Sequence, residues 1–272
     1  MKKVLFILFI SLKVSIFGQS AQNIIDKHIE AIGGKNQLLN LTGVLEKRNI
    51  HIKQVGVSIK SILTIDKKKG LKTELKASSV SAARTEVYNL THAYKVEKEK
   101  VSKISKKRTK YLGNNISDFP SPLLNGDFIF LKNDKYNKID CFVIKRSDGN
   151  TYWISKSDYR LVKSKTNLYH EELGLVQITT TFSNYKKVNG ILFPFQREII
   201  EYQQRIIVEK IVINPKLEKN FFEVTINKTK SKPKVNDKVI LSNPDEIPQE
   251  IFKKTKSYYA AIESMKSLEK AY

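Results

Sequence analysis

Cysteine is almost absent from this chain of 272 residues, which contains only Cys141. A single thiol excludes an internal disulfide and a thiolate metal cluster. Cys141 stands in an apolar-rich segment, residues 139–144, so we expect it to be a small buried side chain. No cysteine follows the apolar run near the N-terminus, and we therefore expect a protein that is not itself a lipoprotein.

Histidine is nearly as scarce, and the common catalytic motifs are missing. The four histidines are scattered without HExxH spacing, so a catalytic metal site is not expected. They are His28, His51, His92 and His170. The group His170-Glu171-Glu172 fits a charged hairpin edge better than an acid/base or metal fragment. Because a nucleophile elbow, a phosphate-binding glycine loop and a dinucleotide fingerprint are also missing, we predict a non-catalytic protein without metal or cofactor.

The first 20 residues have the order of parts of a signal peptide. Lys2 and Lys3 precede an apolar run at residues 4–12, and small residues near Ser20 offer a cleavage site there or after Gly18. The run is shorter than the roughly 20 apolar residues of a membrane-spanning helix, and Lys13 interrupts it. We predict cleavage and export to the periplasm or another part of the cell envelope.

Acidic residues are few relative to basic ones. The chain has 49 Lys and Arg against 27 Asp and Glu, a formal charge of +22, or about +19 without the signal peptide. Such a surface attracts polyanions or anionic lipid head groups, and an anionic membrane is therefore a candidate partner. The densest basic run, residues 95–110, is either an anion-binding strip or, as we favour, a solvated strand face. Export makes nucleic acid an unsuitable partner.

Hydrophobic periodicity predicts a short helical opening followed by a long sheet. Residues 21–32 place isoleucines and His28 on one helical face, and Gly33-Gly34 ends the helix. His28 is therefore expected to be packed rather than a ligand. A second helical turn follows at residues 35–41.

From Gly43 to about Glu223 the apolar residues alternate, which predicts an antiparallel meander. The expected strands are residues 57–65, 71–77, 84–90, 138–146, 150–155, 161–168, 174–183, 191–202 and 205–213. Asp148-Gly149 is the sharpest hairpin signal and Asn189-Gly190 the next. Glycine, asparagine and proline accumulate at residues 112–126, where we expect a long loop.

The last part of the chain has a different composition. Residues 228–272 are rich in lysine and include a Pro-containing segment, and we predict a helix near residues 248–270. We predict three parts: a signal peptide at 1–20, a folded domain at 21–227, and a basic tail at 228–272 that serves for docking.

Three stretches resemble the outer-membrane lipoprotein-sorting proteins, whose fold is that of the periplasmic lipoprotein carriers LolA and LolB. They are IIDKHIEAIGGK at 24–35, TYWISKSDYRLVK at 151–163 and FSNYKKVNGILFPF at 182–195. The resemblance covers roughly residues 21–225. It implies an α+β, mainly β fold, in which a curved antiparallel open half-barrel is covered by helices. It also implies a cavity on the concave side that holds acyl chains.

Alternate strand residues identify the candidates for such a cavity. Residues on one face of a strand point to the same side, and an apolar face must be covered by a helix, a ligand or a partner. The lipid-binding candidates are Val57, Ile59, Leu63, Ile65, Val176, Ile178, Phe182, Phe193 and Phe195. Burial stabilises an acyl chain by about 0.8 kcal/mol per methylene, so a chain of about a dozen carbons needs no directional chemistry.

Two functions follow from these patterns. The first is a periplasmic carrier that binds lipid or the acyl chains of lipoproteins in an apolar concave cavity. The alternative is a structural or adaptor protein of the envelope, whose half-barrel is filled by its own side chains and whose cationic tail docks to another component. A continuous apolar cavity would favour the carrier, and a fully filled core would favour the adaptor.

Overall fold

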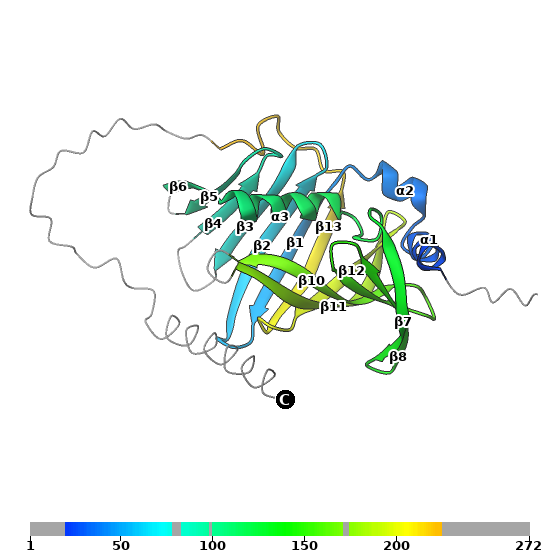
Figure 1. Cartoon of the computed structure of the whole chain (residues 1–272). Coiled ribbons are helices and arrows are strands. Elements are labelled where there is room, and N and C mark those ends of the chain that lie inside the picture. The colour runs from blue at the N-terminus through cyan, green and yellow to red at the C-terminus, as the bar shows by residue number, and fades with distance from the viewer. Residues whose placement is uncertain (1–19, 78–82, 98–99, 171–173, 225–272) are drawn as a thin grey trace, which may run out of the picture. The chain divides into compact units, whose positions relative to one another are not determined.

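A computed structural model describes residues 20–77, 83–97, 100–170 and 174–224 (Figure 1). The predicted signal peptide, apart from Ser20, and the predicted tail at 228–272 lie outside the described residues. None of the described helices is long and apolar enough to cross a membrane.

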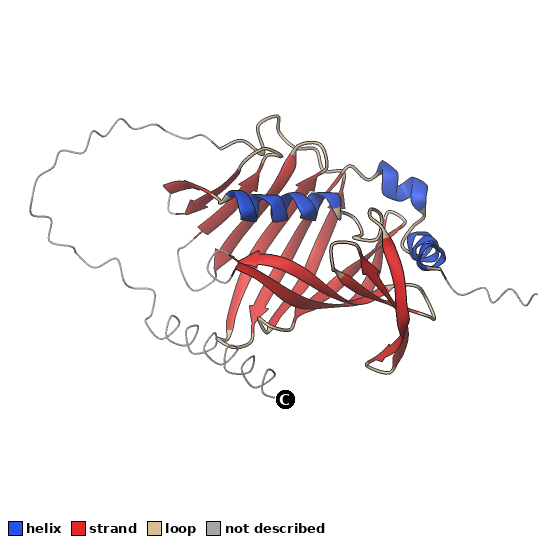
Figure 2. Ribbon diagram, in the orientation of Figure 1, coloured by secondary structure: helices blue, strands red, loops and turns tan. Residues whose placement is uncertain are grey.

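The described part has three helices and thirteen strands (Figure 2). The helices are α1 Ala21–Ala31, α2 Lys35–Asn40 and α3 Lys106–Ser117. The strands are β1 Gly43–Ile52, β2 Val57–Asp66, β3 Gly70–Ala77, β4 Ala83–Tyr88, β5 Ala93–Glu97, β6 Lys100–Lys103, β7 Phe128–Tyr136, β8 Ile139–Arg146, β9 Thr151–Ser155, β10 Leu161–His170, β11 Gly174–Val188, β12 Ile191–Ile199 and β13 Gln204–Ile213.

All thirteen strands form one antiparallel sheet in the order β6-β5-β4-β3-β2-β1-β13-β12-β11-β10-β9-β8-β7. The chain builds two meanders, and the pairing of β1 with β13 joins them. The outer strands β6 and β7 do not pair with each other within the described residues, so this sheet is open. The predicted fold class, mainly β with an open antiparallel half-barrel and covering helices, is confirmed.

The sheet curves around α3. This helix lies across the strands of the first meander (Figure 1) and contacts β3 and β4, and it also contacts β10 of the second meander. An ion pair of 3.0 Å between Arg108 and Glu86 joins α3 to β4. A helix that touches strands six places apart in the sheet order must lie on the sheet's concave side.

Local sequence explains the elements that were predicted correctly. Ser20 caps α1 by accepting a hydrogen bond from the Asn23 amide at 3.2 Å, and α1 buries Ile24 and Ile25. Asn189 and Gly190 both have positive φ, 47° and 85°, as a two-residue type I′ turn between β11 and β12 requires. The Asp148-Gly149 turn likewise joins β8 to β9.

Two local predictions were wrong. The loop expected at residues 112–126 begins only after Ser117, because α3 occupies the first part of that segment. The basic run at residues 95–110 is not one strand face, since it is divided among β5, β6 and the start of α3. Strands β1 and β7 were not among the predicted strands.

Candidate lipid-binding cavity

Three cavities of the described domain matter for a ligand, and the largest of the three has a volume of about 700 Å³. Its walls come from α1, α2, α3, the end of β4 and the loop before β7. The apolar part of the lining includes Ile25, Ile29, Leu38, Ile116, Leu124 and Phe128. Small-molecule sites commonly occupy about 300–1,000 Å³ and are lined mainly by apolar side chains. We call this space the outer cavity.

Two leucines with large exposed surfaces border the outer cavity. Leu39 on α2 is 65% exposed and Leu90, in the turn after β4, is 42% exposed. Leu90 also has a φ of 70°, a left-handed conformation that is unfavourable for a bulky side chain. Strained backbone positions concentrate at functional sites, so Leu90 is a candidate contact for a ligand.

His28 holds α1 against the wall of the domain. Its Nδ1 lies 2.8 Å from the Tyr159 carbonyl oxygen, and its Nε2 lies 2.9 Å from Ser121 Oγ. Burial lowers the pKa of His28 to about 4, against the weaker opposite effect of the Tyr159 hydrogen bond. The ring is therefore neutral at pH 7, with Nδ1–H donating to Tyr159 and Nε2 accepting from Ser121. The prediction that His28 is packed is confirmed.

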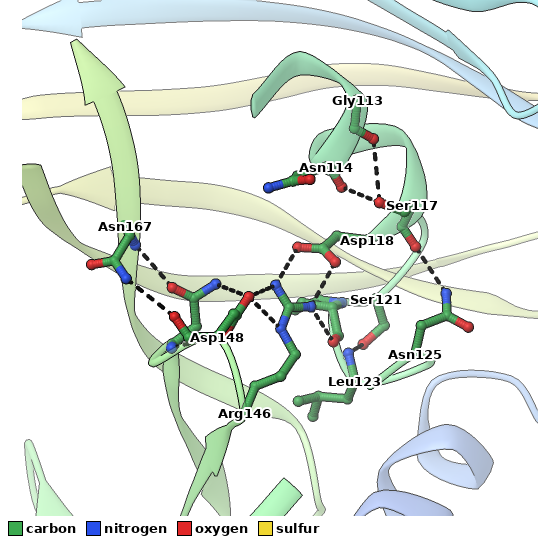
Figure 3. A network of polar contacts seen from close by, with 12 residues as sticks. Gly113, Asn114, Ser117, Asp118, Ser121, Leu123, Asn125, Arg146, Asp148 and Asn167 are labelled. Carbon is green, nitrogen blue, oxygen red and sulfur yellow. Dashed lines mark hydrogen bonds and ion pairs between the residues drawn. The ribbon is translucent and has the colours of Figure 1, made fainter. Parts of the chain in front are cut away.

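Arg146 fixes the loop that follows α3 (Figure 3). It donates to both carboxylate oxygens of Asp118, at 2.6 and 3.1 Å, and to the Pro122 carbonyl at 3.1 Å. It also donates to Asp148 at 2.8 Å. Burial acts to lower the pKa of Arg146, but the hydrogen bonds to Asp118 and Asp148 raise it above its usual value. The loop that separates the outer cavity from the sheet interior is thus held by charge-assisted contacts.

Two smaller cavities are lined mainly by residues of the strands and of the loop after α3, and we call them the inner cavities. One has a volume of about 230 Å³ and the other about 320 Å³. They share Asp118, Phe182 and Arg197, and Phe119 borders both the outer cavity and the smaller inner one. The interior therefore consists of neighbouring spaces divided by the loop after α3.

An ionic cluster that the sequence did not predict borders the smaller inner cavity through Glu46 and Arg197. Arg197 donates to both carboxylate oxygens of Glu46, at 2.6 and 3.1 Å, and Arg48 lies 3.8 Å from the same carboxylate. Glu46 is only 4% exposed. Burial would raise the pKa of Glu46, but the charges of Arg197 and Arg48 hold it below its usual value.

The nine predicted strand residues are distributed unevenly over these cavities. Leu63, Ile65, Phe182 and Phe193 line the smaller inner cavity, and Ile178 and Phe182 line the larger one. Val57, Ile59, Val176 and Phe195 line none of the three cavities. Phe195 is buried in the same cluster as Phe193.

None of the predicted residues lines the outer cavity, which is the largest of the three. Its residues come from helices and loops, and the prediction considered strands alone. Within the described ranges, no group of three or more His, Cys, Asp or Glu side chains is placed to hold a metal ion.

Comparison with known proteins gave matches among solved structures alone. No family model matches the chain, and no curated protein does. A structure of an outer membrane lipoprotein-sorting protein domain from Vibrio parahaemolyticus is 17% identical, with a TM-score of 0.47, and the match covers 74% of this chain and 94% of that one. A LolA superfamily protein from Nitrosomonas europaea is 14% identical, with a TM-score of 0.48, 74% of this chain covered and 97% of that one.

A protein of the DUF1329 family from Desulfovibrio piger is 15% identical, with a TM-score of 0.49, and the match covers 74% of this chain and 96% of that one. These three comparisons show a similarity of fold.

Proposed function

We propose that the protein is a non-catalytic carrier of the periplasm or cell envelope, and that it holds an acyl chain of a lipid or lipoprotein in the outer cavity. The single observation that carries this proposal is a 700 Å³ cavity lined largely by apolar side chains and open beside Leu39 and Leu90. The five predicted residues at the inner cavities belong to the proposal as a second part of the site.

The energetics of burial are sufficient for such a role. About 0.8 kcal/mol per methylene gives on the order of 9 kcal/mol for a chain of about a dozen carbons, before the cost of association is subtracted. On this basis the affinity rises about fourfold with each added methylene until the cavity is full. The adaptor hypothesis requires a half-barrel filled by its own side chains, and a cavity of 700 Å³ favours the carrier instead.

Fatty-acid binding in the outer cavity can be tested with two exposed leucines, one at this cavity and one away from it. Leu39, 65% exposed, borders the outer cavity, whereas Leu175, 60% exposed on β11, borders none of the three cavities. Because both side chains are largely exposed, we expect Leu39→Gln and Leu175→Gln to unfold at nearly the wild-type temperature. Titration with a fluorescent fatty acid should give weaker binding for Leu39→Gln alone. Equal affinity in both variants would argue against the outer cavity as the site.

Leu90 gives an independent test of the same proposal. Asparagine tolerates the left-handed conformation better than leucine, so Leu90→Asn should keep or raise the free energy of unfolding by up to about 1 kcal/mol. Its polar side chain should nevertheless weaken fatty-acid binding. A variant with unchanged binding would remove Leu90 from the proposed site.

A further inference from the structure

Lys67 places an ammonium group at the wall of the outer cavity. The residue directly follows β2, and its backbone amide donates to the Thr42 carbonyl at 2.9 Å. Its Nζ donates to the Leu38 carbonyl at 3.2 Å and lies 5.7 Å from the centre of the Phe119 ring. The half-buried side chain is therefore held in place among residues that line the cavity.

No carboxylate forms an ion pair with Lys67 among the residues that the structure describes. Lys72, on the next strand, illustrates the more usual arrangement, with Glu74 at 3.5 Å. Asp26 and Glu30 also border the outer cavity, but both are exposed on α1. Burial lowers the pKa of Lys67, which agrees with an ammonium that has lost water without gaining an anion.

We propose that the ligand of the outer cavity is an anionic amphiphile, whose carboxylate or phosphate contacts Lys67 while its chain packs against Ile116, Leu124 and Phe128. This inference rests on the proposed function and adds the charge of the ligand's head group. A charge-assisted hydrogen bond from an ammonium to an anion is stronger than a neutral one, and its strength increases as water is excluded. A neutral head group would leave the ammonium without that partner, so the site selects acids over alcohols.

The experiment compares three ligands with the same chain: dodecanoate, dodecyl phosphate and dodecanol, each displacing a fluorescent fatty acid at pH 8. The full chain without its predicted signal peptide should bind both anions at least about tenfold more tightly than dodecanol. Dodecanoate and dodecyl phosphate separate two sources of the charge, a free fatty acid and a phospholipid-type head group. A preference for either anion over the alcohol supports the inference.

Variants of Lys67 test whether this residue is responsible. Lys67→Met should lose about tenfold in affinity for both anions and retain its affinity for dodecanol, and Lys67→Arg should keep the preference for anions. Lys69→Met, an exposed lysine of the same turn, serves as the control and should behave as the wild type. Thermal unfolding confirms that each variant is folded.

Three outcomes would contradict the inference in distinguishable ways. Equal affinity of the wild type for dodecanol and the two anions would overturn the role of charge and leave the carrier proposal standing. An equal loss for all three ligands in Lys67→Met would show that the side chain acts by packing, which also overturns the inference. Absence of binding by every amphiphile would overturn the proposed function, and the inference with it.

Discussion

Neutralising Glu46 should destabilise the domain more than any change to a surface charge. In Glu46→Gln the side chain keeps its size and loses its charge, so Arg197 and Arg48, whose side chains are only 19% and 12% exposed, remain as two cations without a counter-ion. Breaking a buried ion pair in this way costs about 3–5 kcal/mol. For a domain of this size each kcal/mol lowers the melting temperature by about 2–4 °C, which gives a decrease of roughly 6–20 °C.

Thermal and urea unfolding of the purified protein measure this effect. The matched control is Asp140→Asn, which removes an ion pair with Lys135 in which both side chains are 65% exposed. Exposed pairs contribute about 0–1 kcal/mol, so the control should unfold close to the wild type. The double variant Glu46→Leu with Arg197→Met should recover much of the loss, because it removes the carboxylate together with its bidentate partner.

A Glu46→Gln protein that unfolds within about 1 kcal/mol of the wild type would refute this reasoning. It would mean that water reaches the two guanidinium groups and takes the place of the Glu46 carboxylate as their hydrogen-bond partner. The inner cavities would then be hydrated, and the burial of Glu46, Arg48 and Arg197 would have little energetic weight.

Two further predictions concern pH and the tail. The folded-state pKa of His28, about 4, lies below its usual value of 6.5, so its contribution to stability is complete above pH 6.5 and declines as the pH falls to 4. The free energy of unfolding should fall by up to about 3 kcal/mol over this pH range. In urea unfolding, the free energy of unfolding of His28→Gln should decrease less between pH 7 and pH 4.5 than that of the wild type. Deletion of residues 228–272 should leave cooperative unfolding intact and reduce co-sedimentation with anionic liposomes, whereas loss of cooperativity would place the tail in the folded core.

The strands and hairpins were predictable because they depend on neighbouring residues. Alternation identifies a half-buried strand, and Asn189-Gly190 has the conformational freedom that a type I′ turn needs. Helix α3 was missed because Gly113, Asn114 and Asn115 are poor helix formers. It forms because Ser105 caps it, accepting from the Arg108 amide at 3.3 Å, and because Leu112 and Ile116 are buried against the sheet.

The site was harder to predict because its residues are brought together only by the tertiary structure. Leu39 and Leu90 lie 51 positions apart, and neither has a pattern that distinguishes it from other leucines. Alternation indicates that Leu63 and Phe182 share the concave side, but it does not indicate where the loop after α3 leaves space. The pairing of Glu46 with Arg197 spans 151 positions, and charged residues in a strand are normally expected to face water.

Photo-crosslinking tests the central claim, binding of an acyl chain in the outer cavity, most directly. A fatty acid with a diazirine near the end of its chain is bound, irradiated and located by peptide mass spectrometry. We predict saturable labelling of residues that line the outer cavity, such as Leu38, Ile116, Leu124 and Phe128, and competition by unlabelled fatty acid. Labelling that does not saturate, or that falls on exposed side chains such as Ile129 and Leu175 instead, would contradict the claim.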